Sequence, residues 1–307
     1  MNEVKSQGQS PHMGPSGQGS EAHSPFEVLG DRAGAFPVLF SVPHAGRDYP
    51  SSLLTRSRQP VEVLRRLEDR YADILVADLV DAGYGAVVAG TARAAIDLNR
   101  DSRDIDPRTI DVIPAGQPLI QSAKQRGGLG LFPRSLSRAG DLWSRPMPWE
   151  EALARIRTIH MPYHMAIAGL LDTIQARHGQ ALLIDLHSMP PLTIGERHGR
   201  PPDVVIGDRF GASASPRFAE LVRAIVSRHG LTAAVNHPYP GYYLVERHGR
   251  PGAGRHAIQV EISRDLYLDD ALDRPGRRVR AICALMAELA AALAEEVSRG
   301  DFAIAAE

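Results

Sequence analysis

The sequence has one cysteine, almost no net charge and no long apolar run. Cys283 alone excludes an intramolecular disulfide framework and a zinc site built from cysteines, and we expect a buried, inert thiol. Lysine and arginine number 35 against 36 acidic residues, so a net charge of −1 gives no overall field that attracts nucleic acid or an anionic membrane. No apolar stretch approaches the ~20 residues of a membrane span, and the N-terminus lacks a signal-peptide pattern. We therefore expect a cytoplasmic protein without nucleic-acid or membrane partners, in an oligomeric state that no pattern indicates.

The 307 residues suffice for one large α/β domain. Residues 1–24 are polar and rich in Gly, Ser, Pro and Gln, so they cannot bury enough surface to offset the entropy lost on ordering. The sequence thus predicts a disordered tail over 1–24 and a single catalytic domain over 25–307.

Short apolar runs typical of strands alternate with amphipathic helical segments along this domain. The predicted strands are 38–42, 85–90, 94–98, 181–186, 203–206, 233–236 and 256–262. The predicted helices are 61–82, 149–179 with an interruption at Pro162, 216–229 and 275–299. This alternation predicts a three-layer α/β sandwich with a mainly parallel or mixed central sheet, whose ligands collect beyond the carboxyl ends of the strands. Residues 101–148 are irregular, which is typical of an ordered functional loop or a lid.

Chemically active side chains lie where several of these strands end. The side chains in question are His44, Asn99, Arg100, His187, Glu261 and Arg264. Glu261 lies inside an apolar run, where an ionised carboxylate is costly unless it is paired or bound to a metal. Such a set at four strand ends is hard to explain by packing alone, so we expect the residues to meet at one edge of the sheet.

Two histidines and a carboxylate form a three-ligand zinc site that leaves a position open for water. Zinc lowers the pKa of that water to about 7 in favourable sites, and an unligated glutamate such as Glu261 takes the proton and passes it to a leaving amine. The amide and guanidinium of Asn99 and Arg100 suit a bidentate grip on a carboxylate. The residues therefore predict zinc-assisted hydrolysis of an amide whose product side carries a carboxylate.

Five segments resemble, in the same order, the N-formylglutamate amidohydrolase (N-formylglutamate deformylase) family. They are "SVPHAGRDYP", "DRYADIL", "ARAAIDLNRD", "LLIDLHS" and "NHPYPGYYLVERHGRPGAGRHAIQVEISRDLYLDD". The likeness runs over about residues 37–271 and is weakest over 103–148. "DLNR" and "DLHS" are also similar to motifs of aspartoacylase and of zinc carboxypeptidase-like hydrolases.

The resemblance implies a zinc carboxypeptidase-like fold and one Zn²⁺ ion. The implied substrate is a small anionic N-acyl amino acid, either N-formyl-L-glutamate or a similar one. The implied reaction is hydrolysis of N-formyl-L-glutamate to formate and L-glutamate, within histidine degradation. By motif, His44 and His187 are the zinc ligands, Asn99 and Arg100 hold the substrate carboxylate, and Glu261 is the general base. Further residues expected near the substrate are Arg93, His164, Tyr242 and Arg264.

The sequence departs from these patterns at two places. Arg47 stands where carboxypeptidases have a glutamate ligand, three residues after the first histidine, so the third ligand comes from elsewhere. Asp69, on the predicted helix 61–82, matches an acidic position of the family, and we favour it over Asp48. Tyr242 stands where the family commonly has a second glycine. We expect the tyrosine to narrow or reshape the pocket, so the resemblance does not fix the identity of the acyl group.

Other interpretations remain open. The chain is alternatively a zinc carboxypeptidase-like hydrolase of a short peptide or another N-acyl substrate, or a binding homologue without turnover. His160 and His164 are four residues apart, a spacing that can bind metal from one helix face, although Pro162 bends that helix. Asp185 either orients the ring of His187 or bonds to the backbone where the strand ends.

Overall fold

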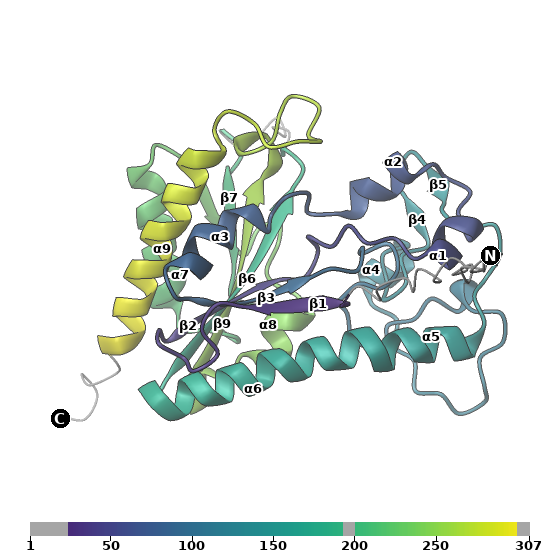
Figure 1. Cartoon of the computed structure of the whole chain (residues 1–307), viewed down its shortest axis with the longest axis horizontal. Coiled ribbons are helices and arrows are strands. Elements are labelled where there is room, and N and C mark those ends of the chain that lie inside the picture. The colour runs from purple at the N-terminus through teal and green to yellow at the C-terminus, as the bar shows by residue number, and fades with distance from the viewer. Residues whose placement is uncertain (1–23, 193–199, 300–307) are drawn as a thin grey trace, which may run out of the picture.

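A seven-stranded sheet runs through the centre of the computed structural model, which describes residues 24–192 and 200–299 (Figure 1). The strand order is β1-β3-β2-β6-β9-β7-β8. Strands β3, β2, β6 and β9 are parallel to one another. Strand β1 is antiparallel to β3 and β7 is antiparallel to β9, whereas β8 is parallel to β7. The bounds are β1 Phe26–Leu29, β2 Val38–Val42, β3 Gly85–Ala89, β6 Ala181–Met189, β7 Val204–Gly207, β8 Ala233–Val235 and β9 Arg255–Ser263.

Helices cover both faces of this sheet. One face carries α3 (Ile74–Asp81), α7 (Pro216–Arg228) and α9 (Val279–Arg299), and the other carries α6 (Met161–His178) and α8 (Tyr243–His248) (Figure 1). Successive residues of β6 face opposite ways, so Ile184 belongs to the core with Phe218 and Leu183 to the core with Tyr163. Burial on both faces explains the continuous apolar runs of the central strands. The predicted α/β sandwich with a mixed central sheet is confirmed.

A lobe of short elements lies beside the sheet, at the right of Figure 1. It contains α1 (Ser51–Arg56), α2 (Val61–Leu64), α4 (Ala123–Arg126), β4 (Ser135–Leu136), β5 (Gly140–Asp141) and α5 (Trp149–Arg155). Two buried clusters hold it together, one with Phe132 and Trp149 and the other with Leu53 and Leu142. Residues 101–148 are therefore mostly irregular, as predicted, but they pack around cores of their own.

The predicted helix over 61–82 is wrong as a single element. It is divided into α2, a 3-10 turn at Arg65–Leu67, and α3. Between the last two, Tyr71 has a positive φ of 56°, and the backbone N–H of Asp69 donates to the carbonyl oxygen of His44 at 2.9 Å. A continuous helix would use that N–H internally. The break instead carries Asp69 to the end of β2.

The predicted strand over 94–98 is also wrong, because these residues form turns. The N–H of Ala95 donates to the carbonyl of Ala92, and the N–H of Asp97 donates to the carbonyl of Leu131 in the lobe. Ile96 is buried in a lobe cluster and Leu98 is buried beneath α6. The apolar run is therefore buried by loop packing, which a pattern of hydrophobic residues does not distinguish from a strand.

The interruption predicted at Pro162 in helix 149–179 is wrong in its position, because α6 runs through that proline. The departure from α-helix is a π-helical turn at Ile156–His160, between α5 and α6. Pro162 lies in the first turn of α6, where its missing N–H is tolerated. Figure 1 shows α5 and α6 as one long helical rod beneath the sheet and the lobe.

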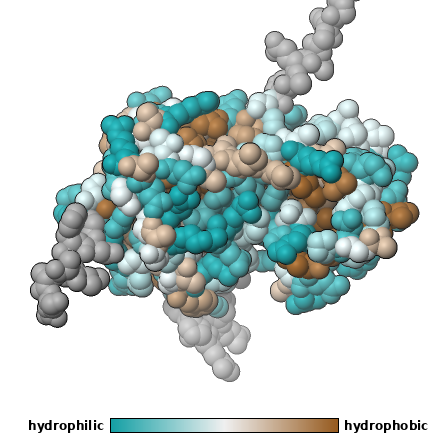
Figure 2. Space-filling view, turned by 90° about the horizontal axis from the view of Figure 1, so that it is seen from below, coloured by the Kyte–Doolittle hydropathy of each residue, from teal (hydrophilic) through white to brown (hydrophobic). Residues whose placement is uncertain are grey.

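The face of the molecule seen from below is mainly hydrophilic, with separate small hydrophobic patches (Figure 2). In the two described ranges, none of the helices has the length and apolar character that crossing a bilayer requires. The predicted disordered tail over 1–24 falls outside the described residues, apart from Ser24.

Candidate active site

Three buried side chains from three separate segments meet at the carboxyl ends of β2 and β6. His44 follows β2, His187 lies in β6, and Asp69 lies in the break before α3. Asp48 is exposed, and its backbone forms a bridge to Thr91 instead. Of the two candidate acids, the structure thus brings Asp69 to the histidines.

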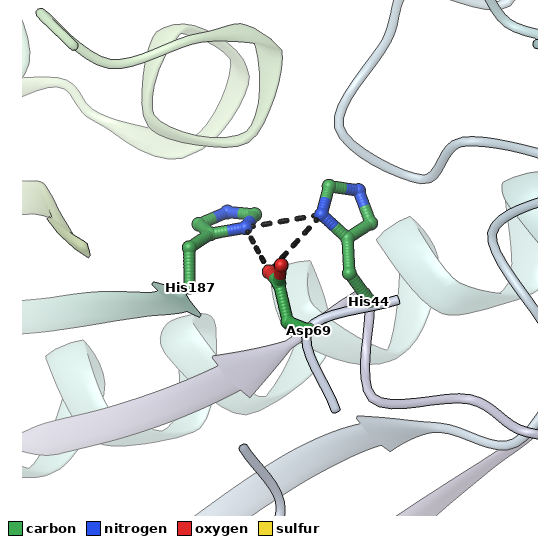
Figure 3. Close-up of side chains that lie close together, drawn as sticks. All are labelled: His44, Asp69 and His187. Atoms are coloured by element: carbon green, nitrogen blue, oxygen red, sulfur yellow. Dashed lines mark hydrogen bonds and ion pairs between the residues drawn. The ribbon is translucent and has the colours of Figure 1, made fainter. Parts of the chain in front are cut away.

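The two rings point Nδ1 atoms at one another, 3.1 Å apart (Figure 3). Oδ2 of Asp69 lies 3.0 Å from Nδ1 of His187 and 3.4 Å from Nδ1 of His44. A tetrahedral zinc ion with bonds of about 2.0–2.1 Å separates its ligand atoms by about 3.4 Å. Two nitrogens and one oxygen at these separations therefore fit the protein ligands of a zinc ion.

The opposite nitrogen of each ring faces a buried carboxylate. Nε2 of His44 lies 2.7 Å from Oδ1 of Asp97, and Nε2 of His187 lies 2.8 Å from Oδ2 of Asp185. An ionised carboxylate only accepts hydrogen bonds, so each Nε2 carries a proton and each Nδ1 is the nitrogen that faces the other ligand atoms. Asp185 thus orients the ring of His187, which was one of its two predicted roles.

The buried carboxylates in and around this cluster favour positive charge at its centre. Burial acts to lower the pKa of His187, but the carboxylates of Asp185 and Asp69 outweigh it and hold the pKa well above its ordinary value. Burial acts to raise the pKa of Asp69, but its hydrogen bonds with His187 and His44 hold it well below the usual range. A cation bound between the three ligand atoms satisfies the same demand.

Glu261 lies beside this cluster on the neighbouring strand. In the register of β6 and β9 it is paired with His187, and Gln259 is paired with Asp185. Nε2 of Gln259 donates to Oε1 of Glu261 at 2.9 Å. Burial raises the pKa of Glu261 to about 7, against the opposing effect of His187. A carboxyl group with such a pKa is suited to accept and release a proton near neutral pH.

A pocket of about 190 Å³ opens onto the cluster and Glu261. Five residues predicted to contact the substrate line it, namely Arg93, Asn99, Arg100, Tyr242 and Arg264. Tyr242 also lines a larger cavity of about 630 Å³, which it shares with Asn99 and Arg100. The tyrosine therefore forms part of the lining of two spaces, as Asn99 and Arg100 do.

Two of the pocket arginines are paired with carboxylates of the site. Arg93 bonds to Oδ2 of Asp97 through Nε at 2.9 Å and Nη2 at 2.8 Å. Arg264 donates to Oδ1 of Asp69 at 3.0 Å, which leaves Oδ2 of that carboxylate for the histidines. Burial acts to raise the pKa of Asp97, but Arg93 and its neighbours hold it well below the usual range. Both arginines thus stabilise the carboxylates around the candidate metal site.

Asn99 and Arg100 are held firmly within the loop that carries them. The side-chain oxygen of Asn99 accepts from the N–H of Leu244 at 2.8 Å, and its Nδ2 lies 3.1 Å from Nε2 of His187. Arg100 donates from Nε to the carbonyl of Leu129 and from Nη1 to the carbonyl of Asn99. A grip on a substrate carboxylate by these two residues stays a prediction.

His160 and His164 hold this loop from behind. Nε2 of His160 donates to the carbonyl of Arg100 at 2.8 Å, and Nε2 of His164 donates to the carbonyl of Leu98 at 3.0 Å. Nδ1 of His164 then accepts from Nε2 of His248 at 3.0 Å. Both nitrogens of His164 are used within the protein and the side chain is buried, so the structure gives it a positioning role. Contact with substrate stays a prediction.

Sequence reasoning missed two residues of the site, Asp97 and Gln259. A signal existed for Asp97, because "IDL" occurs at 96–98 and again at 184–186, where Asp185 was recognised. Gln259 had a weaker signal, a polar side chain two residues before Glu261 and on the same strand face. Arg47, which replaces the carboxypeptidase glutamate, pairs with Asp73 away from the cluster.

Comparison with known proteins identifies the family of the chain. The model of the N-formylglutamate amidohydrolase family matches residues 36–268. An N-formylglutamate deformylase of Pseudomonas aeruginosa is 30% identical over 80% of this chain and 86% of its own, and one of Pseudomonas putida is 28% identical over the same shares. A crystal structure of N-formylglutamate amidohydrolase from Ralstonia eutropha superposes with a TM-score of 0.83 at 30% identity, over 90% of this chain and 99% of the other. The chain belongs to the N-formylglutamate amidohydrolase family.

Proposed function

We propose that the protein is a zinc-dependent amidohydrolase that converts N-formyl-L-glutamate and water into formate and L-glutamate. The observation that carries the proposal is the meeting of His44, Asp69 and His187 beside Glu261, in a chain of this family. We also propose that it works in the cytoplasm, in histidine degradation, because the resemblance to the family implies that role.

His44, Asp69 and His187 would hold one zinc ion through Nδ1, Oδ2 and Nδ1. Zinc at this position supplies a Lewis acid and lowers the pKa of water. Glu261 takes a proton from the water that attacks the formyl carbonyl, and it delivers that proton to the nitrogen as the C–N bond breaks. The buried position of Glu261, next to His187 in the sheet, keeps this carboxylate beside the reacting group.

The substrate carboxylate lies against Asn99 and Arg100 in this proposal. The two residues line the pocket together with Tyr242, whose ring centroid is 5.2 Å from Cζ of Arg100. The hydrogen bonds that fix this loop to Leu129, Leu244 and α6 prepare it for binding before substrate arrives, which reduces the entropy lost on binding.

Metal analysis of the purified protein and formate release from N-formyl-L-glutamate test this function. We expect one zinc ion per chain and formate release that a chelator stops and added zinc restores. Bound zinc without release from any N-acyl amino acid would favour a binding protein instead. A metal-free protein in which His44→Ala leaves activity intact would refute the mechanism.

A related second function is favoured by the larger cavity. The cavity of about 630 Å³ shares Tyr242 with the pocket and has room for an N-acyl group longer than formyl or for a short peptide. The second function is therefore hydrolysis of such a substrate. Hydrolysis rates over a series from N-formyl to N-hexanoyl glutamate distinguish this function from deformylation of N-formyl-L-glutamate. A maximum at the longer chains would favour this alternative.

A further inference from the structure

We propose that Lys124 binds the second carboxylate of an N-formyl dicarboxylic amino acid and thereby selects substrates with an acidic side chain. The inference rests on the proposed function and names a specificity-determining residue for it. Lys124 lies on α4 in the lobe, and its side chain lines both the pocket and the larger cavity.

Among the described residues, Lys124 differs from the other cationic side chains of the pocket in having no hydrogen bond to a protein oxygen. The cationic side chains that line it are Arg66, Arg93, Arg100, Lys124 and Arg264. The four arginines donate to oxygens of the protein: Arg93 and Arg264 to carboxylates, and Arg66 and Arg100 to backbone carbonyls. Within residues 24–192 and 200–299, by contrast, the contacts of the Lys124 ammonium are with the faces of aromatic rings alone.

Two tyrosines hold this ammonium in place. Nζ of Lys124 lies 5.0 Å from the ring centroid of Tyr242 and 5.9 Å from that of Tyr239. An aromatic face attracts a cation through its quadrupole but accepts no strong hydrogen bond from it. The three N–H donors of the ammonium therefore remain available to an anion.

The position of Lys124 suits a ligand with two carboxylates. Arg100 lies near the same Tyr242 ring, with Cζ 5.2 Å from its centroid. A small dicarboxylate can thus place one anionic end by Arg100 and the other by Lys124. An ammonium on a flexible stem tolerates the rotation of an acidic side chain better than a guanidinium fixed by backbone carbonyls does.

The kinetic test compares N-formyl-L-glutamate with N-formyl-L-glutamine, which has the same shape but a neutral side chain. We expect Lys124→Met to reduce the preference for glutamate in kcat/KM by about 10- to 100-fold, as expected for loss of a charge-assisted hydrogen bond. The loss should appear in KM, because the interaction is made equally in the ground and transition states. Lys124→Arg should restore part of the preference.

Arg126→Gln is the matched control. Arg126 lies on the same short helix and bonds to the carbonyl of Gln121, and the two spaces at Lys124 are lined without it. It removes the same charge, so an unchanged preference in this variant shows that the effect of Lys124→Met is local. A long-range effect of net charge would lower the preference in both variants and would contradict the proposal.

The outcomes separate this inference from the proposed function. A wild-type protein that hydrolyses neither substrate would refute the function itself. A wild-type protein that prefers glutamate while Lys124→Met keeps that preference would overturn the inference alone. Equal losses on both substrates in Lys124→Met would also overturn it, because they show a role unrelated to the acidic side chain.

Amine labelling gives a second readout that does not depend on turnover. Lys5 and Lys124 are the two lysines of the sequence, so Lys5 serves as the internal reference. In a Glu261→Gln background, N-formyl-L-glutamate should slow the reductive methylation of Lys124 relative to Lys5, as followed by mass spectrometry. N-formyl-L-glutamine at the same occupancy should not. Equal protection by both, or by neither, would contradict the proposal.

Discussion

Asp97 accepts a hydrogen bond from Nε2 of His44 at 2.7 Å and so fixes which nitrogen of that ring faces the candidate metal site. Asp185 does the same for His187 at 2.8 Å. Asp185 precedes its histidine by two residues in one strand, whereas Asp97 reaches His44 from a loop of turns. Two "IDL" segments of different structure thus provide the same support.

We expect Asp97→Asn to weaken zinc binding about 10- to 100-fold, as removal of a carboxylate behind a ligand histidine typically does. An asparagine keeps the size of the side chain but no longer stabilises a protonated Nε2 as strongly. Competition with a chromophoric chelator measures the affinity. Asp73→Asn is the control, because Asp73 pairs with Arg47 outside the cluster. Wild-type affinity in Asp97→Asn would show that the hydrogen bond does not set ligand strength.

Glu261→Gln should lower kcat by about 10²- to 10⁴-fold while zinc remains bound, because the amide cannot accept the proton from water. The matched control is Gln259→Glu, which adds a carboxylate two residues away on the same strand face. Combined with Glu261→Gln in a double variant, it should not restore turnover, since residue 259 is paired with Asp185 rather than with His187. Formate release and zinc content are measured on the same samples. Turnover that survives in Glu261→Gln would mean that another group is the base.

Tyr242→Gly should join the pocket to the cavity of about 630 Å³ that lies beyond the ring. We expect the ratio of kcat/KM for N-butyryl over N-formyl glutamate to rise, since the longer chain gains room while the formyl group loses a wall. Tyr242→Phe keeps the ring and should keep the wild-type ratio. If Tyr242→Phe raises the ratio as much as Tyr242→Gly does, the hydroxyl group rather than the ring controls the choice of acyl group.

Stability should fall as the pH drops below about 6.5, because His248 is buried next to His164. Burial lowers the pKa of His248 to about 3 from 6.5, with Arg247 adding to the effect. Between these values the unfolded chain binds a proton that the folded chain does not, so the free energy of unfolding falls with decreasing pH, by about 1.4 kcal/mol per pH unit for one such group.

His248→Gln can keep the donor to His164 but does not titrate. Chemical denaturation between pH 4.5 and 7.5 should give a shallower pH dependence for this variant than for the wild type. His229→Gln, at a histidine paired with Glu288 at the surface, serves as the control for removing a histidine. Equal slopes for His248→Gln and the wild type would contradict the prediction.

The central strands and the groups at their ends could be predicted from the sequence, because burial on both sheet faces leaves an apolar run that stops where a polar side chain emerges. His187 and Glu261 are recognisable for this reason. Asp69 could be named only by resemblance, since its position depends on a backbone bond to His44 that breaks a helical pattern. The strand predicted at 94–98 is wrong because the lobe buries Ala94, Ala95 and Ile96, and α6 buries Leu98, without adding them to a sheet.

His187 and Glu261, which carry the proposed reaction, lie at paired positions on β6 and β9, apart from the residues of the proposed substrate recognition. The backbone ladder of the sheet fixes the relative position of these two side chains. Lys124 and Tyr242 lie outside the sheet, where insertions and exchanges disturb no ladder. If the proposed roles hold, relatives of this protein can diverge in the amino acid that they accept by changing such positions, while the groups that perform the hydrolysis stay the same.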